Sequence, residues 1–271
     1  MDTELLNGRF NRIGARLKVN DTAKRRWRAR TGALSIDIGN DRKGEFFALH
    51  LDPHLPPELN VVDVRPNMRH LLLMANGGFD KADRQKFLCG HDERHWFVAA
   101  VPEAANASNV ATALNALKPT RVRAAEARVG LKRRDGFRRK NRAFVRQGEW
   151  FFLPRPDARI DTSLTLRKEP LTRGLGNKPH IVDELVRSGG ETVYVTRGGG
   201  LIITRSAYDK IARQDRKRAR QFVRMRRNPG VFVRGRVRHP DHKTIVLHCW
   251  HEVVMNTENQ ASAMRHVAFL D

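Results

Sequence analysis

The sequence predicts an α+β protein with two antiparallel-sheet-rich domains joined by a basic connector, and with a long basic amphipathic helix in the second domain. Three features predict this fold. Short apolar runs alternate with turn residues over much of the chain, one segment is strongly basic, and another spaces its apolar residues as a helix does. With 271 residues, 40% of them apolar, the chain can bury a sizeable core.

Residues 33–101 carry the pattern of a small antiparallel sheet. Apolar stretches such as "ALSIDI", "EFFALHL" and "HWFVAAV" are separated by turn segments such as "GNDRKG". After Pro102 the segment "ASNVATALNALKP" favours a helix, because Ser108 can serve as its N-cap and Pro119 stops it. We therefore expect an N-terminal α+β domain over residues 1–118.

Residues 119–142 are predicted to form the basic connector. From Thr120 onward this segment holds ten basic residues against two acidic ones and almost no large apolar residues, so it can bury little surface by itself. The second domain, residues 143–271, is expected to be β-rich. Its "AFVRQGEWFFLP" predicts a strand pair around Gln147-Gly148, and "ETVYVTRGGGLIITR" predicts another with Gly198 to Gly200 at its tip.

The clearest helix is predicted near residues 207–227. Ser206 can cap its start, apolar residues such as Ile211 and Phe222 recur at helical spacing, and Asn228-Pro229-Gly230 ends the run. Its remaining faces carry nine cations, which only two aspartates interrupt. An ordinary solvated face usually mixes both signs of charge, so we favour contact with phosphate over the solvated-face alternative.

The charge of the whole chain points to a polyanionic partner. The formal net charge is +23 and the pI is about 11.2. Residues 1–118 hold 18 Lys and Arg against 14 Asp and Glu, whereas residues 119–271 hold 34 against 15. We expect nucleic acid to bind the second half. RNA is favoured over DNA because no helix-turn-helix, zinc-finger or basic-zipper pattern is present.

The predicted nucleic-acid contacts lie on the basic helix, on the strand after it and in an N-terminal cluster. In "VFVRGRVRH" the strand period places three arginines on one face and the valines on the other. In "KRRWRAR", residues 24–30, Trp27 is either a stacking platform among cations or a core anchor. The predicted contacts are Arg25, Arg26, Trp27, Arg28, Arg213, Arg216, Lys217, Arg220, Arg224, Arg227, Arg234, Arg236 and Arg238.

The segment "RHPDHKTIVLHCWHE", residues 238–252, holds four of the eleven histidines and one of the two cysteines. It predicts a hairpin with Pro240 to Lys243 as the reversal and His239 opposite Thr244. The shorter clump "CGHDERHW", residues 89–96, is most simply another charged hairpin turn. "RGLGNKPHIVDELVR", residues 173–187, is expected to be a plain loop before a short helix that starts at Pro179, with phosphate binding as the alternative.

Three interpretations of these histidines remain open. They can contact nucleic acid by stacking or hydrogen bonding without reacting, which fits the neighbouring arginines best. They can catalyse RNA cleavage as general acids and bases, the residues being His239, Asp241, His242 and His251. They can hold zinc, because both cysteines occur as C-x-H, the ligands being Cys89, His91, Cys249 and His251. We expect no cofactor, the cysteines being small buried hydrophobes, and zinc is the alternative.

The function we expect is nucleic-acid binding within a ribonucleoprotein. The alternatives are a nucleic-acid-processing enzyme, a nuclease or phosphoesterase acting at the histidine hairpin, and a scaffold for an acidic protein partner. Motifs for nucleotide hydrolysis, serine hydrolysis and zinc proteolysis are absent from the sequence. Two cysteines 160 positions apart and the lack of an apolar signal core predict a cytoplasmic protein without a membrane partner.

Overall fold

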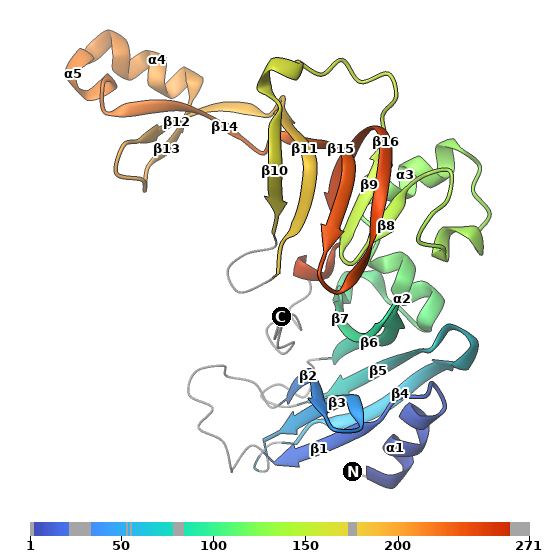
Figure 1. Ribbon diagram of the computed structural model, residues 1–271. Helices are drawn as coiled ribbons and strands as arrows, with labels where there is room; N and C mark the ends of the chain where they lie inside the picture. The colour runs from blue at the N-terminus through green and yellow to red at the C-terminus, as the bar shows by residue number, and fades with distance from the viewer. Residues whose placement is uncertain are drawn as a thin grey trace.

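The computed structural model describes residues 3–21, 34–52, 54, 56–77, 84–172 and 178–260 (Figure 1). Within these residues the chain forms four sheets, and nearly all strand pairs are antiparallel. The α+β class is therefore confirmed, while the division into two domains and a connector stays a prediction. No helix in the described ranges is long and apolar enough to cross a membrane.

The N-terminal half contains a three-stranded sheet, β1-β3-β2, and a four-stranded sheet, β4-β5-β6-β7, that share one core. Strands β1 and β3 pair in parallel. Phe47 is fully buried between the sheets, with its ring 5.1 Å from Phe10 and 5.5 Å from Trp96. The elements are α1 (Thr3–Asn11), β1 (Leu17–Asp21), β2 (Leu34–Asp41), β3 (Gly44–Leu51), β4 (Glu58–Arg65), β5 (His70–Asn76), β6 (Arg84–Asp92) and β7 (His95–Val101).

Helix α2 (Val110–Ala116) packs its apolar residues on the other face of the four-stranded sheet. The N-cap of α2 is Asn109, one position after the expected Ser108. The Asn109 side chain accepts a hydrogen bond from the Thr112 backbone, and the Thr112 hydroxyl accepts one from the Asn109 backbone. This reciprocal pair of hydrogen bonds satisfies two backbone N–H donors at the start of the helix. It fixes Asn109 as the N-cap, one residue after the predicted Ser108.

The predicted connector contains a helix that packs against the C-terminal half. Helix α3 (Thr120–Arg128) buries Val122 and Ala125 against Phe144 and Phe151. The few large apolar residues of this segment predict that it buries little surface by itself, and the structure differs. Val122 and Ala125 lie three positions apart on one face of α3, Val129 and Leu131 pack beside them, and the aromatic residues that cover them come from residues 143–153.

The C-terminal half contains a six-stranded antiparallel sheet in the order β10-β11-β15-β16-β9-β8. The β8–β9 pair forms at the predicted place, with Gln147 opposite Trp150 and Gly148 in the turn at φ +56. The strands are β8 (Val145–Gln147), β9 (Trp150–Pro154), β10 (Leu166–Leu171), β11 (His180–Ser188), β15 (Gly230–His239) and β16 (His242–Met255). Short 3-10 helices are Pro66–Met68, Glu103–Ala105, Asp135–Phe137, Thr162–Leu164 and Glu258–Gln260.

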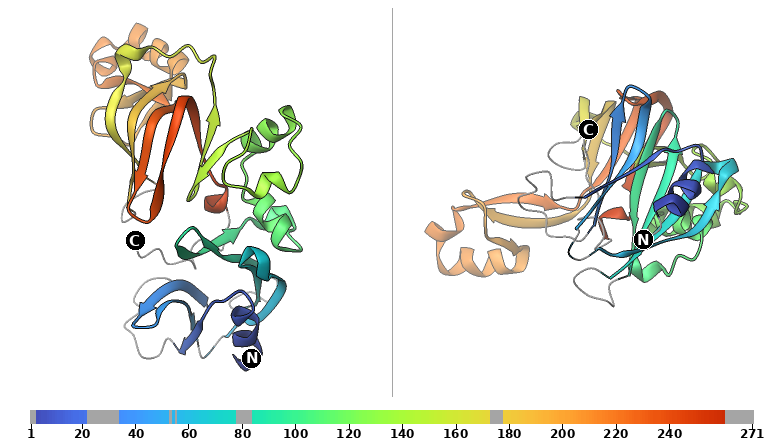
Figure 2. Two further views of the ribbon diagram at one scale, coloured as in Figure 1. Left: turned by 45° about the vertical axis from the view of Figure 1, so that its right-hand side comes forward. Right: turned by 90° about the horizontal axis from the view of Figure 1, so that it is seen from below.

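A basic arm, residues 191–227, is inserted between β11 and β15 and projects from the end of the six-stranded sheet (Figures 1 and 2). Its small sheet has the order β13-β12-β14, and the predicted hairpin with glycines at its tip is confirmed as β12–β13. The elements of the arm are β12 (Glu191–Thr196), β13 (Ile202–Thr204), α4 (Arg205–Gln214), α5 (Arg216–Ala219) and β14 (Phe222–Arg227).

The prediction of a single helix near residues 207–227 is wrong, because this range forms α4, α5 and β14. The helix breaks at Asp215, whose backbone is extended and whose carboxylate accepts hydrogen bonds from the backbone N–H groups of Lys217 and Arg218 to begin α5. From Phe222 the chain pairs with β12 as a strand. This pairing outweighs helix propensity, which is only a weak preference. The start also differs, since Thr204 rather than Ser206 caps α4.

The β15–β16 hairpin exists, but its predicted register is wrong. The turn has two residues, Pro240 and Asp241, so that His239 lies opposite His242 rather than Thr244. Further along, the register shifts at Gly235, which has φ +88. A four-residue turn and a regular ladder were both assumed from the sequence. The shorter turn brings the two histidines side by side.

Candidate functional site

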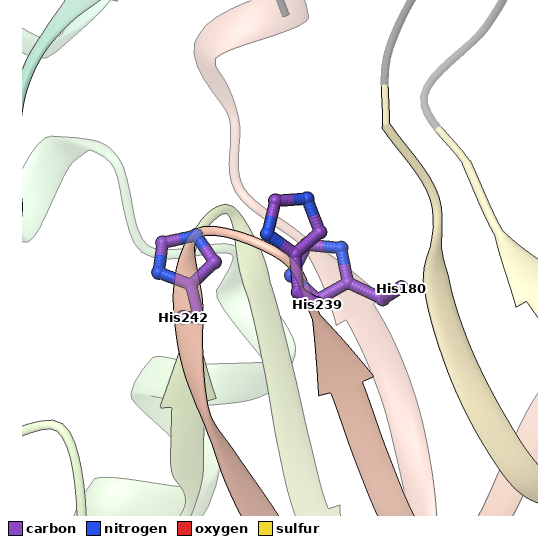
Figure 3. A group of neighbouring side chains, drawn as sticks. All are labelled: His180, His239 and His242. Carbon is purple, nitrogen blue, oxygen red and sulfur yellow. The ribbon is translucent and has the colours of Figure 1, made fainter.

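Three histidines meet at one end of the six-stranded sheet (Figure 3). His180 is the first residue of β11, His239 the last of β15 and His242 the first of β16. One ring nitrogen from each lies within 4.8 Å of the other two. The ring of His180 stacks on that of His239 with centroids 4.2 Å apart, and His242 lies 4.8 Å from His239. We call these residues the histidine cluster.

His180 is the most deeply placed member of the cluster. Its side chain is only 2% exposed, and neither ring nitrogen has a hydrogen-bond partner among the described residues. His242 has one such nitrogen, Nδ1. A buried polar atom without a partner costs about 1–3 kcal/mol, so native proteins seldom keep one without a reason.

His239 has partners that fix its tautomer. The backbone N–H of Asp241 donates to its Nδ1 at 3.2 Å, and its Nε2 lies 3.2 Å from the carbonyl oxygen of Lys178. Since a carbonyl oxygen only accepts, the proton of the neutral ring sits on Nε2. Nδ1 therefore keeps a lone pair.

The environment favours neutral imidazoles. Burial, followed by the effects of the neighbouring His239 and His242, lowers the pKa of His180 to about 3. Burial, followed by the effect of His239, lowers the pKa of His242 to about 4. At neutral pH both rings are uncharged, which is the form of histidine that binds metals.

The β6–β7 hairpin of the N-terminal half reaches the cluster. Glu93 in its turn accepts a hydrogen bond from the Lys243 backbone at 2.7 Å, and the same carboxylate oxygen lies 3.8 Å from Nδ1 of His242. Asp92 pairs with Arg139 and Arg146 at 3.1 Å. The "CGHDERHW" segment is a hairpin turn as expected, and the structure places it against the other histidine-rich turn.

A cavity of about 460 Å³ lies where the two hairpins meet. All three members of the histidine cluster line it, together with His95 and the Lys178–Asp241 ion pair, whose atoms are 2.9 Å apart. Gly148 leaves the space beside the rings open. A Cβ at this position would lie 3.1 Å from Nε2 of His242 and 3.5 Å from Nε2 of His180.

The four residues expected to hold zinc are not brought together. Cys89 is buried in the N-terminal core, where burial raises the pKa of its thiol, and His91 packs edge-on against Trp96. Cys249 lies on β16 with its Sγ 3.8 Å from Nδ1 of His251. In the part of the chain that the structure describes, the histidine cluster is the only group of three or more potential ligands close enough for one ion.

Of the four expected acid–base residues, His239, Asp241 and His242 line the cavity, whereas His251 is buried opposite Val233 in the middle of the sheet. His180 was missed because its segment was interpreted as a loop followed by a helix. The β-branched pair Ile181-Val182 and the later Gly189-Gly190 are the signals of a strand that ends there.

The predicted nucleic-acid contacts lie in three places. Arg25, Arg26, Trp27 and Arg28 fall outside the described residues. The three arginines on β15 face carboxylates of β11: Arg234 pairs with Glu184 at 2.7 Å, and Arg236 and Arg238 share Asp183 at 3.2 and 2.7 Å. The six others are exposed on the arm: Arg213, Arg216, Lys217, Arg220, Arg224 and Arg227.

No family model matches this chain. Comparison with curated proteins and with solved structures likewise finds no significant match.

Proposed function

We propose that the protein binds nucleic acid through the basic arm, with RNA as the favoured ligand. The observation that carries this proposal is the charge of residues 191–227, which hold eleven Lys and Arg against three acidic residues. Such an excess of cations on one element attracts a phosphate backbone, and the attraction does not depend on base sequence.

Few cations of the arm are neutralised by the protein itself. Arg227 pairs with Glu191 at 2.5 Å, and Arg205 lies 3.9 Å from Asp209. The third carboxylate, Asp215, accepts backbone hydrogen bonds at the start of α5. The following cations are exposed and have no ion pair among the described residues: Arg197, Lys210, Arg213, Arg216, Lys217, Arg218, Arg220 and Arg224.

The shape of the arm also favours this role. It projects away from the six-stranded sheet in Figure 1 and in the right-hand view of Figure 2, so a polyanion can approach it without meeting the body of the protein. A small core holds it in shape: Tyr194 stacks on Tyr208 at 3.7 Å, and Phe222 is buried beside them. Helices α4 and α5 are short and follow no DNA-reading pattern, and proteins that recognise RNA by shape commonly use arginine-rich surfaces.

The test is a binding titration with labelled RNA and with DNA of the same sequence at several salt concentrations. Changing Arg213, Arg216, Arg220 and Arg224 to Gln should weaken binding because phosphate contacts are lost. The slope of log K against log salt should flatten by about 0.7 to 0.9 for each lost contact. Gln preserves helix propensity at Arg213 in α4 and at Arg216 in α5, and all four side chains are exposed, so the fold of the arm is retained.

A matched control removes four positive charges from the N-terminal half. Arg9, Arg12, Arg42 and Lys43 are exposed there, and their change to Gln should leave affinity and slope close to the wild type. Equal losses in both variants would mean that only net charge matters, and no loss in either would remove the arm from the function. Tighter binding of DNA than of RNA would reverse the preferred ligand.

A further inference from the structure

We propose that His180, His239 and His242 form a zinc site with one open coordination position that faces the cavity. This inference is independent of the proposed role of the arm, because β11 runs from His180 at the cluster to Ser188 at the base of the arm. The two sites therefore lie at opposite ends of the same strand.

The donor set decides the kind of metal. Three imidazoles suit zinc and its neighbours among the transition metals, whereas calcium and magnesium require oxygen ligands. Zinc sites with four protein ligands are structural, and those with three keep a fourth position for water or substrate. The cluster supplies three ligands and borders a cavity of about 460 Å³, which is the second arrangement.

The unpartnered nitrogens are the strongest evidence for a ligand. His180 is only 2% exposed, and both its ring nitrogens lack a hydrogen-bond partner among the described residues. A histidine that only filled the core would be expected to hydrogen-bond at least one nitrogen. A metal ion would supply a partner for one of the two nitrogens, because each histidine offers one ligand atom.

The surroundings prepare the rings for an ion. The Lys178 carbonyl occupies Nε2 of His239, so an ion would take the lone pair of Nδ1, which now accepts the Asp241 N–H at 3.2 Å. A Glu93 carboxylate oxygen lies 3.8 Å from Nδ1 of His242, on the side where carboxylates stand behind zinc-bound histidines. Gly148 keeps side-chain atoms away from the nitrogens of His180 and His242. Nitrogens bound to one zinc ion lie about 3.3 Å apart, so binding would draw the ring nitrogens together by up to about 1.5 Å and would replace the hydrogen bond from Asp241 to His239.

The test begins with the wild-type full chain. After removal of metals with dipicolinate and dialysis against zinc, elemental analysis should find about one equivalent of zinc per chain. Reconstitution with Co²⁺ should give the intense visible absorption of a four-coordinate ion without the near-ultraviolet band of a thiolate ligand. Azide should change that spectrum, because an open position accepts an external anion. An intense spectrum that azide leaves unchanged would contradict the open position.

Variants then assign the ligands. His180→Ala should weaken zinc binding by more than about 100-fold, and His242→Gln should also weaken it. His248→Ala is the matched control, since His248 is exposed on the same strand β16, and it should keep the metal. Cys249→Ser should keep it as well, which separates this site from a cysteine-containing one.

Three results would overturn the proposal: wild-type protein that takes up well under one equivalent, zinc retained by both His180→Ala and His242→Gln, or zinc lost in Cys249→Ser. Circular dichroism of each variant shows whether it is folded. If His180→Ala does not fold, the wild-type stoichiometry, the cobalt spectrum and His242→Gln still decide the question.

Discussion

The imidazole of His180 stacks on that of His239 with ring centroids 4.2 Å apart, although the two residues are separated by the whole basic arm in the sequence. The contact follows from strand register, because Ile181 pairs with Arg238 and the residues just before and after them become neighbours. The two-residue turn after His239 adds His242 to the pair. Three strand ends thus produce a cluster that no short segment contains.

Zinc should stabilise the folded protein. An ion that binds only the native state at 100 times its Kd adds about 2.7 kcal/mol, which for a chain of this size raises Tm by roughly 5 to 10 °C. Differential scanning fluorimetry with zinc and with magnesium checks this. Magnesium should have no effect, and a zinc-induced rise of the same size in His180→Ala would show that the ion binds elsewhere.

Gly148→Ala should weaken zinc binding more than its backbone strain explains. The added Cβ would lie 3.1 Å from Nε2 of His242, in the space beside the cluster. Gly189→Ala is the control, because Gly189 also has a positive φ, +74, and a Cβ there meets nothing within 4 Å. Isothermal titration with zinc should show weaker binding for Gly148→Ala only. Equal affinities in the two variants would mean that the open space at Gly148 has no role.

The ion pairs of Asp183 predict an acid-dependent stability difference. Backbone and side-chain hydrogen bonds from Arg236, and the side chain of Arg238, lower the pKa of Asp183 to about 2 from its ordinary value of 3.8. A carboxylate with a lowered pKa stabilises the fold above the unfolded-state pKa, and this contribution disappears as the pH falls through about 2. Asp183→Asn should therefore lower Tm at pH 7 and by progressively less below pH 4.

Thermal unfolding of wild type and Asp183→Asn from pH 7 to pH 2 measures this difference. A gap in Tm that stays constant with pH would mean that the loss is not electrostatic. The same variant frees Arg236 and Arg238, so tighter RNA binding by Asp183→Asn would add the β15 arginines to the nucleic-acid surface.

The sequence was informative wherever a local pattern decides the structure. The hairpin at Gln147-Gly148, the glycine tip at residues 198–200 and the hairpin that carries His239 and His242 all form where turn residues interrupt apolar runs. These features depend on residues that are close in sequence.

The sequence was uninformative where distant segments compete. Residues 222–227 have helical spacing, yet they pair with β12, and no local signal reveals that partner. His180 joins the cluster through its register with β15. Periodicity reports which residues share a face and says nothing about which strands become neighbours, so the strand order and the third histidine could not be predicted.

The most direct test of the central claim, that the arm is the nucleic-acid surface, is RNA binding by a variant without it. Ser188 and Gly230 lie opposite each other in the β11–β15 ladder, so residues 189–229 can be replaced by the two-residue turn Asn-Gly. Fluorescence anisotropy with labelled RNA should show at least a tenfold loss of affinity, while the zinc content stays at that of the wild type. Unchanged RNA affinity in this folded variant would contradict the account.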